Sequence, residues 1–360
     1  MEDNKHNGSI ALWKFIYCII IIALHVTATL KYRDGTLFAG ASICVSFFFI
    51  VSGYLMEKKA LKNNDKENDI GIETKNYILN KVLKIFPYTL IAHILCIIAI
   101  IVTKKSYSTS SIISSIWELL FLGTSGIKHT GVNYVTWYIS AMFISMLALY
   151  PLILKLKKKF IYVIGPLIII LVGGYISFKY NNLSRGPIYK LLLMAIFQLS
   201  IGVVIYEISE KIKNIKFTNI GKFLLGIIEL FGFSSILFLS NIKDSHNKYD
   251  FIMLLILTIS IAIAFSEQSI YSKLLKNKFF YTLEKYSIPL YLNQVWIIEI
   301  VNYYLVGKWP NLNYFAIVGI VVGIDILASV GEEYIIKLLK KIIKKLKKVI
   351  INDEPEREGV

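Results

Sequence analysis

The amino-acid sequence predicts an all-α, polytopic integral membrane helix bundle with about ten transmembrane helices and both termini in the cytoplasm. Of the 360 residues, 56% are hydrophobic, and the mean hydropathy is +0.60. A soluble protein has about 45–50% apolar residues. Uncharged runs of about 20 residues recur along the chain, and a helix needs about that length to cross a bilayer. The alternating pattern of a transmembrane barrel is absent from these runs.

The apolar runs, taken in order, define ten expected spans joined by polar segments. No small-residue cleavage site follows the first run, so we expect it to be retained rather than removed as a signal peptide. The segment 57–84 is polar and charged. Within 104–133, the apolar stretch 112–122 is too short to span, and we expect a re-entrant or interfacial helix there. The expected spans are 10–30, 37–56, 85–103, 134–154, 160–178, 188–207, 221–241, 251–268, 287–306 and 313–336.

The formal net charge of +16 is distributed as in a membrane protein. With these spans and a cytoplasmic N-terminus, 28 of the 40 lysines and arginines fall on the inside and 10 on the outside. The positive-inside rule therefore supports cytoplasmic termini. This distribution argues against nucleic acid as a partner and makes membrane lipids the expected surroundings.

We expect one membrane domain over 1–336, followed by a basic amphipathic cytoplasmic tail over 337–360. In 337–349, lysines lie on one helical face while Leu, Ile and Val side chains fill the other. This pattern is typical of a helix that lies on a membrane surface. Binding to a partner protein stays open as an alternative for this helix.

Lys14 and His25 are ionisable side chains within the first apolar run. Such groups are costly at membrane depth and are functional-site hypotheses by default. Eleven positions at about 100° each make roughly three turns, so both side chains share one face, about 16 Å apart along the axis. This spacing indicates a site for a long substrate with a charged head. A histidine satisfied only by a backbone carbonyl is the alternative.

Cysteine chemistry does not account for such a site. Cys18, Cys44 and Cys96 all fall in expected spans and form neither a metal-binding spacing nor a disulfide framework. We expect them to be packing residues, and we expect no bound metal.

An ordered set of short motifs resembles the membrane acyltransferase 3 family over almost the whole chain. Lys14 and His25 resemble its Arg-x10-His signature, with lysine in place of arginine. Gln294 stands where many members carry histidine. The other similar segments are Phe-Phe-Phe-Ile-Val-Ser-Gly-Tyr-Leu at 47–55, Lys-Val-Leu-Lys-Ile-Phe-Pro-Tyr at 81–88, Trp-Tyr-Ile-Ser at 137–140 with Tyr-Pro at 150–151, Arg185 with Phe-Gln-Leu-Ser-Ile-Gly at 197–202, and Ser-Ile-Pro-Leu-Tyr-Leu-Asn-Gln at 287–294.

The resemblance implies a multi-pass plasma-membrane O-acyltransferase. It would move an acyl group, commonly acetyl, from cytoplasmic acyl-CoA to a hydroxyl of a cell-surface polysaccharide or lipid-linked sugar. Acyl-CoA would be a co-substrate, with no bound cofactor. His25 would be the general base, since its unperturbed pKa of about 6.5 suits that role. Lys14 would hold a carbonyl or phosphate, and Lys81 and Lys84 would join it in binding acyl-CoA. Residues expected to line the acceptor pocket or to pack helices are Ser52, Gly53, Trp137, Ser140, Arg185, Tyr291 and Asn293.

Two other functions stay open from the residues alone. A transporter or flippase of glycan intermediates could use the intramembrane acids Glu229, Glu299 and Asp325. It would also predict broken helices at corresponding positions of two halves, yet no internal repeat is visible. A non-catalytic component of a glycan-assembly system is the other alternative. Binding of acyl-CoA would separate an acyltransferase from both. The acceptor, the acyl group and the oligomeric state are not encoded in a motif that we can read.

Overall fold

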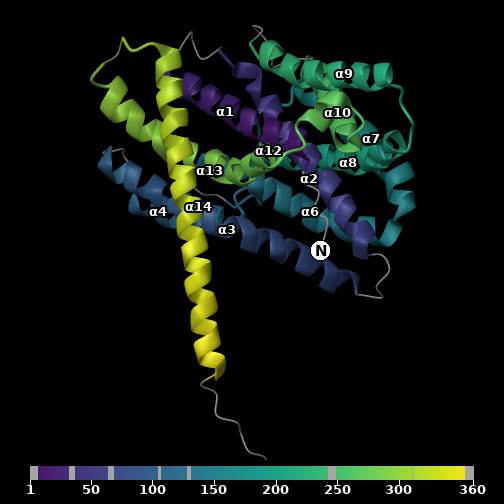
Figure 1. The fold of residues 1–360 in the computed structure, drawn as a ribbon. Coiled ribbons are helices and arrows are strands. Elements are labelled where there is room, and N and C mark those ends of the chain that lie inside the picture. The colour runs from purple at the N-terminus through teal and green to yellow at the C-terminus, as the bar shows by residue number, and fades with distance from the viewer. Residues whose placement is uncertain are drawn as a thin grey trace, which may run out of the picture.

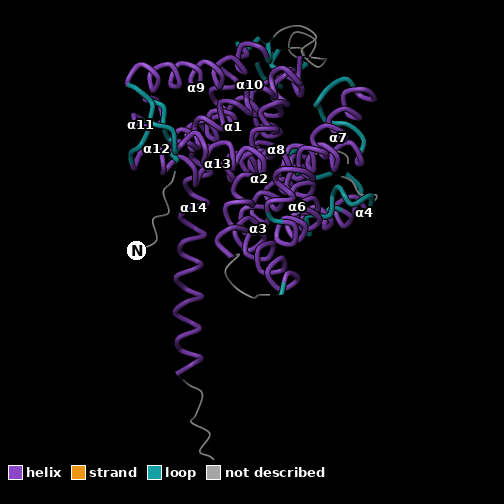
Figure 2. Tube along the Cα trace, turned by 90° about the vertical axis from the view of Figure 1, so that its right-hand side faces the viewer, coloured by secondary structure: helices purple, strands orange, loops and turns teal. Residues whose placement is uncertain are grey.

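The computed structural model describes residues 7–31, 37–63, 69–103, 107–127, 131–241, 249–309 and 311–352. These residues form helices and connecting segments, with no strand among them (Figures 1 and 2). The longer helices are α1 (Gly8–Leu30), α2 (Ile43–Asn63), α3 (Ile70–Val102), α6 (Trp137–Leu156), α7 (Gly165–Tyr180), α8 (Ile188–Lys213), α9 (Asn219–Leu239), α10 (Tyr249–Ser266), α13 (Ser287–Val301) and α14 (Tyr314–Asn352). The short elements are η2 (Ala39–Ser42), α4 (Thr109–Ser114), α5 (Ile116–Leu119), η3 (Tyr134–Thr136), η4 (Phe160–Ile164), α11 (Ile270–Leu274), α12 (Lys278–Leu283), η5 (Glu284–Tyr286) and η6 (Asn302–Val306).

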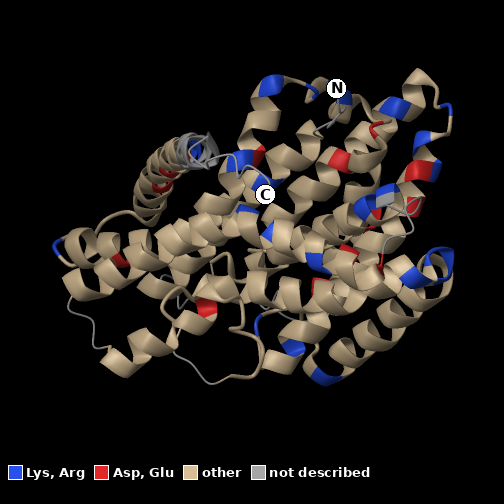
Figure 3. Cartoon of the chain, turned by 90° about the horizontal axis from the view of Figure 1, so that it is seen from below, with Lys and Arg blue, Asp and Glu red and all other residues tan. Residues whose placement is uncertain are grey.

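The polytopic helical fold predicted from the sequence is confirmed. Within the described ranges, 9 helices are long and apolar enough to cross a membrane, and they correspond to nine of the ten expected spans. The tenth span, 287–306, is α13 followed directly by η6. Its α-helical part has only 15 residues because the last turns widen into a π-helix. Lysine and arginine lie mostly at helix ends and in connecting segments (Figure 3). The cytoplasmic location of the termini stays a prediction.

Two glycines allow α2 and α8 to approach backbone to backbone. A Cβ atom added to Gly53 would lie 2.1 Å from the carbonyl oxygen of Leu199, and one added to Gly202 would lie 2.1 Å from that of Ile50. Small residues are what permit such contacts between membrane helices. Gly53, which we expect from the sequence to line the acceptor pocket or to pack helices, thus packs against α8.

Helix α1 lies along the segment formed by η5 and α13. Lys14 forms an ion pair with Glu284, and His25 hydrogen-bonds to Gln294. Between these levels, the Cys18 thiol donates to the carbonyl of Ser287, 3.3 Å away. Residues later in α1 contact residues later in the segment 284–294, so the two run in the same direction. Lys14 and His25 therefore face one common neighbour, as their helical spacing predicts.

The C-terminal helix α14 is continuous from Tyr314 to Asn352. It runs steeply across its neighbours and projects beyond the bundle (Figures 1 and 2). No helix end marks the expected boundary between 1–336 and the tail, and residues 353–360 lie outside the described ranges. The division into a domain and a surface-lying tail stays a prediction.

The apolar stretch 112–122 contains two short helices, α4 and α5, with a break at Ser115. Glu118 of α5 is buried and accepts the backbone N–H groups of Val132 and Asn133, at 3.1 and 2.9 Å. This carboxylate ties the segment to the entry into η3, so it has a clear structural role.

Candidate functional site

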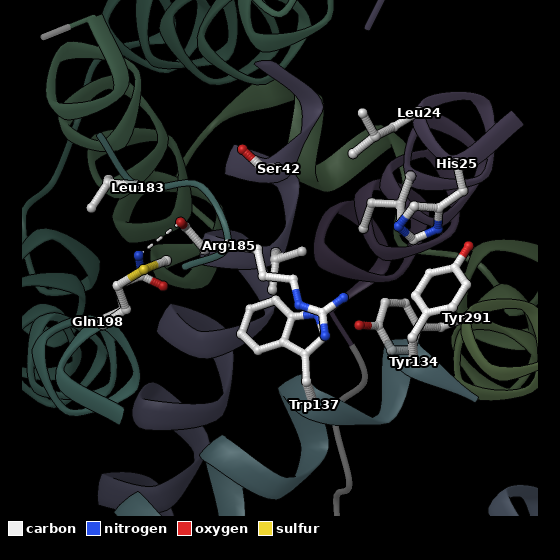
Figure 4. Close-up of a pocket in the computed structure, with 13 residues that line it drawn as sticks. Leu24, His25, Ser42, Tyr134, Trp137, Leu183, Arg185, Gln198 and Tyr291 are labelled. Atoms are coloured by element: carbon white, nitrogen blue, oxygen red, sulfur yellow. Dashed lines mark hydrogen bonds between the residues drawn. The ribbon is translucent and has the colours of Figure 1, made fainter. Parts of the chain in front are cut away.

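A cavity of about 80 Å³ lies beside His25. It is formed by α1, the start of α2, the turn into α6, the segment before α8, α8 itself and α13 (Figure 4). These elements are far apart in the sequence and meet only in the folded bundle. The lining residues are Ile21, Leu24, His25, Ser42, Val45, Ser46, Tyr134, Trp137, Leu183, Arg185, Met194, Gln198 and Tyr291.

The hydrogen bonds of Gln294 determine the tautomer of His25. The Gln294 Nε2 group donates to the carbonyl oxygen of Tyr291, 2.6 Å away. A carbonyl cannot donate, so this contact turns the amide oxygen Oε1 towards His25, whose Nδ1 lies 2.7 Å from it. That oxygen can only accept, so Nδ1 carries the proton and Nε2 carries the lone pair. Within the described part of the chain, no residue hydrogen-bonds to Nε2.

Aromatic side chains hold the imidazole from the other side. The rings of His25 and Tyr134 meet edge to face, with centroids 5.2 Å apart and an interplanar angle of 85°. Tyr291, which is buried, donates its hydroxyl to the carbonyl of Val135 at 2.8 Å. Tyr134 also lines a second cavity of about 100 Å³, together with Trp296 and Glu299. One tyrosine thus lies between two cavities, with His25 against it.

Two residues that line the first cavity carry buried polar atoms without partners. Gln198 is fully buried and donates through Nε2 to Ser46 Oγ at 2.9 Å, which Figure 4 marks with a dashed line. Its Oε1 atom and the Ser42 hydroxyl have no hydrogen-bond partner in the described structure. Buried polar groups are rarely left in this state. The wall is therefore suited to a ligand that carries hydroxyl groups.

Three lysines form what we call the basic cluster: Lys14, Lys81 and Lys84. The charges of Lys14 and Lys84 are near enough to act on Lys81. Lys81 is half-buried, with Nζ 5.4 Å from the ring centroid of Tyr77, whereas Lys84 is exposed. None of the three lines the cavity at His25. Lys14 forms an ion pair with Glu284, whereas the described residues show no ion pair of Lys81 or Lys84.

The predicted acceptor residues separate into two groups. Trp137, Arg185 and Tyr291 line the cavity together with His25. Ser140 does not line it, because its hydroxyl donates to Phe121 and accepts the N–H of Thr124.

Asn293, Ser52 and Gly53 are likewise absent from the cavity wall. Asn293 bridges Glu332, at 2.9 Å, and Trp296, at 3.1 Å. Ser52 interacts with the Tyr138 hydroxyl, and Gly53 packs on α8. For these residues and for Ser140, the structure supports the packing role that the sequence left open.

Sequence reasoning missed Tyr134, Ser42 and Gln198 as wall residues. Gln198 lay within a motif but carried no separate signal. No group of three His, Cys, Asp or Glu side chains among the described residues is arranged to hold a metal ion.

The fold and the site together define a multi-pass membrane protein that holds an oriented histidine beside an internal cavity, whose mainly apolar wall also carries polar side chains. A family model described as an acyltransferase domain matches residues 7–330. The chain therefore belongs to the acyltransferase 3 family, and its activity is of the acyltransferase type, with a transferred group other than aminoacyl. A search of the curated proteins and a search of the solved structures each found no significant match.

Proposed function

We propose that this protein is a plasma-membrane O-acyltransferase that uses His25 as its general base. It would move an acyl group, acetyl in the first instance, from cytoplasmic acyl-CoA to a hydroxyl of a cell-surface polysaccharide or lipid-linked sugar. The observation that carries the proposal is the His25 ring, whose Nδ1–H is bound to Gln294 and whose Nε2 is left as a proton acceptor beside the cavity.

The basic cluster supports the choice of donor. Acyl-CoA has an anionic phosphate head and a long thin arm that ends in a thioester. Lysine ammonium groups bind phosphates through charge-assisted hydrogen bonds. Lys14 and His25 are separated by about 16 Å of helix, so a head at the cluster leaves the arm to reach the histidine. Because Lys14 does not line the His25 cavity, its position favours contact with a phosphate over contact with the reacting carbonyl.

The reaction that this arrangement supports is a single acyl transfer. His25 Nε2 removes the proton from the acceptor hydroxyl as its oxygen attacks the thioester carbonyl carbon. The carbon–sulfur bond then breaks, and the sulfur leaves as the CoA thiolate. The imidazolium returns its proton to that thiolate, so His25 ends the cycle in its starting form. The products are the acylated acceptor and CoA.

The experiment that tests this proposal uses the full chain in vesicles with radiolabelled acetyl-CoA inside. The acceptor is surface glycan from the producing cells, freed of esters by mild alkali. His25→Gln keeps an amide that can donate to Gln294 but cannot take a proton, so label transfer should fall by about 10²- to 10⁴-fold. His93→Gln, a buried histidine outside the cavity that hydrogen-bonds to Ser115, is the matched control.

Unchanged transfer by folded His25→Gln protein would refute the role of His25. Movement of glycan across the membrane without acyl-CoA, and without label transfer, would instead support a transporter.

A further inference from the structure

Two buried charges hold the segment between α7 and α8 in place. Asp250 of α10 accepts the N–H of Leu183 through Oδ2, at 2.6 Å. Lys190 of α8 donates to Asn182 Oδ1 at 2.6 Å and to the carbonyl of Ser184 at 2.8 Å. Asp250 is 0% exposed and Lys190 is 2% exposed, so both contacts are shielded from water. The backbone at 182–184 is therefore fixed by charge-assisted hydrogen bonds.

Arg185 is the next residue, and it reaches the cavity that contains His25 (Figure 4). Its charge acts on His25, Tyr134 and Tyr291. Among the described lining residues it is the one with a fixed positive charge. The structure shows no hydrogen bond or ion pair of Arg185 within the described ranges, and its side chain is exposed. The segment thus presents an unpaired guanidinium at the cavity without burying it.

Other residues that line the cavity supply neutral polar groups. Gln198 Oε1 and Ser42 Oγ have no partner, although both atoms are buried. A sugar ring could satisfy them through its hydroxyl groups, whereas a guanidinium forms its best contacts with carboxylate or phosphate oxygens. The cavity therefore combines contacts for hydroxyls, one contact for an anion and a proton acceptor at His25.

We infer that the acceptor is an anionic glycan, with a carboxylate or phosphate that binds Arg185 while a nearby hydroxyl is acylated at His25. This inference rests on the proposed function and specifies its substrate class. The anion takes no part in bond making or breaking. It positions the sugar, and the contacts of Asp250 and Lys190 with the segment 182–184 position Arg185.

The test compares chemically neutralised forms of the same acceptor. Ester-free surface glycan from the producing cells is divided into an untreated sample, a sample whose carboxylates are reduced to alcohols, and a sample whose phosphodiesters are cleaved by hydrofluoric acid. Label transfer from acetyl-CoA is measured in vesicles for the wild type, Arg185→Gln and Arg185→Lys. Lys179→Gln, which removes an exposed charge near the end of α7, is the matched control.

Arg185→Gln should raise the KM for untreated glycan by about 10- to 100-fold, as expected for one lost charged hydrogen-bonded contact, and leave kcat within about threefold. Arg185→Lys should recover part of this loss because it restores the charge without the planar fork. The ratio of wild-type to Arg185→Gln kcat/KM should fall to about one on the sample that lacks the recognised anion. If this ratio falls in the carboxylate-reduced sample, Arg185 binds a carboxylate. If it falls in the sample treated with hydrofluoric acid, Arg185 binds a phosphate.

Other results would overturn the inference. Equal losses on all three samples, seen in kcat, would mean that Arg185 acts on the acyl group or on the cavity structure. No loss on any sample would mean that it binds no acceptor anion, while the proposed acyltransferase activity would stand. Failure of the wild type to label even the untreated glycan would refute the proposed function, and this inference with it.

Discussion

The contact between Gln294 and His25 gives the most direct test of the proposed mechanism. Gln294→Leu removes the acceptor of the Nδ1–H bond at nearly constant volume. Gln294 is 0% exposed, so water does not readily replace the lost oxygen. An unsatisfied buried donor costs about 1–3 kcal/mol, and each 1.36 kcal/mol of barrier changes a rate tenfold. If this free-energy cost is added to the activation barrier because the His25 ring is no longer held in its catalytic orientation, kcat should fall by roughly 5- to 150-fold.

Single-turnover transfer of labelled acetyl groups in vesicles measures this change. Acetyl-CoA affinity should stay within about twofold, because the basic cluster lies about 16 Å away along α1. Gln294→His, which places the family's common residue here, can still accept the Nδ1–H bond and should retain most activity. The role of Gln294 in orienting His25 is refuted if folded Gln294→Leu transfers acetyl groups at the wild-type rate. It is also refuted if the variant loses rate only through weaker acetyl-CoA binding.

Three further predictions concern packing and donor binding. Gly53→Ala should destabilise the fold by about 1–3 kcal/mol and lower Tm, because the added Cβ atom clashes with the α8 backbone. Gly174→Ala, whose Cβ atom would meet nothing within 4 Å, should leave Tm unchanged. Equal Tm values for the two variants would contradict the close packing of α2 on α8. Lys81→Gln should weaken acetyl-CoA binding about tenfold, most strongly at low salt. The control Lys273→Gln, which removes an exposed charge, should leave binding unchanged. Equilibrium binding of acetyl-CoA to the purified proteins measures both effects. Glu284→Gln should tighten acetyl-CoA binding by about threefold, because it frees the Lys14 ammonium to bind phosphate. Weaker or unchanged binding in the same assay would exclude Lys14 as a phosphate ligand.

The helices and the shared face of Lys14 and His25 could be predicted because both depend on local periodicity. A run of about 20 apolar residues spans a membrane in almost any context, and eleven residues of helix return to the same face. The contacts of these side chains with Glu284 and Gln294 follow from the pairing of α1 with a segment about 270 positions later. The local sequence of neither segment predicts that pairing.

The cavity wall could not be predicted in the same way. Tyr134, Ser42 and Gln198 come from three different elements, and each is an ordinary packing residue until those elements meet. Gly53 shows the same limit, because its lack of a side chain predicted a close approach without naming α8 as the neighbour. The anchoring of the segment before Arg185 by Asp250 also depends on a contact with α10, 67 positions later in the sequence. Sequence periodicity carries no information on such contacts.

The parallel course of α1 and the segment 284–294 sets a minimum length for a productive donor. Lys14 and His25 are each bound to that segment, so neither side chain can shift towards the other without breaking a contact. A donor that engages both must bridge the distance with its own covalent arm. Small activated esters and truncated thioesters could reach the histidine only by giving up the lysines. Selection among acyl donors would then depend on the phosphate head, which binds far from the reacting carbon. The cavity would select only for the size of the acyl group.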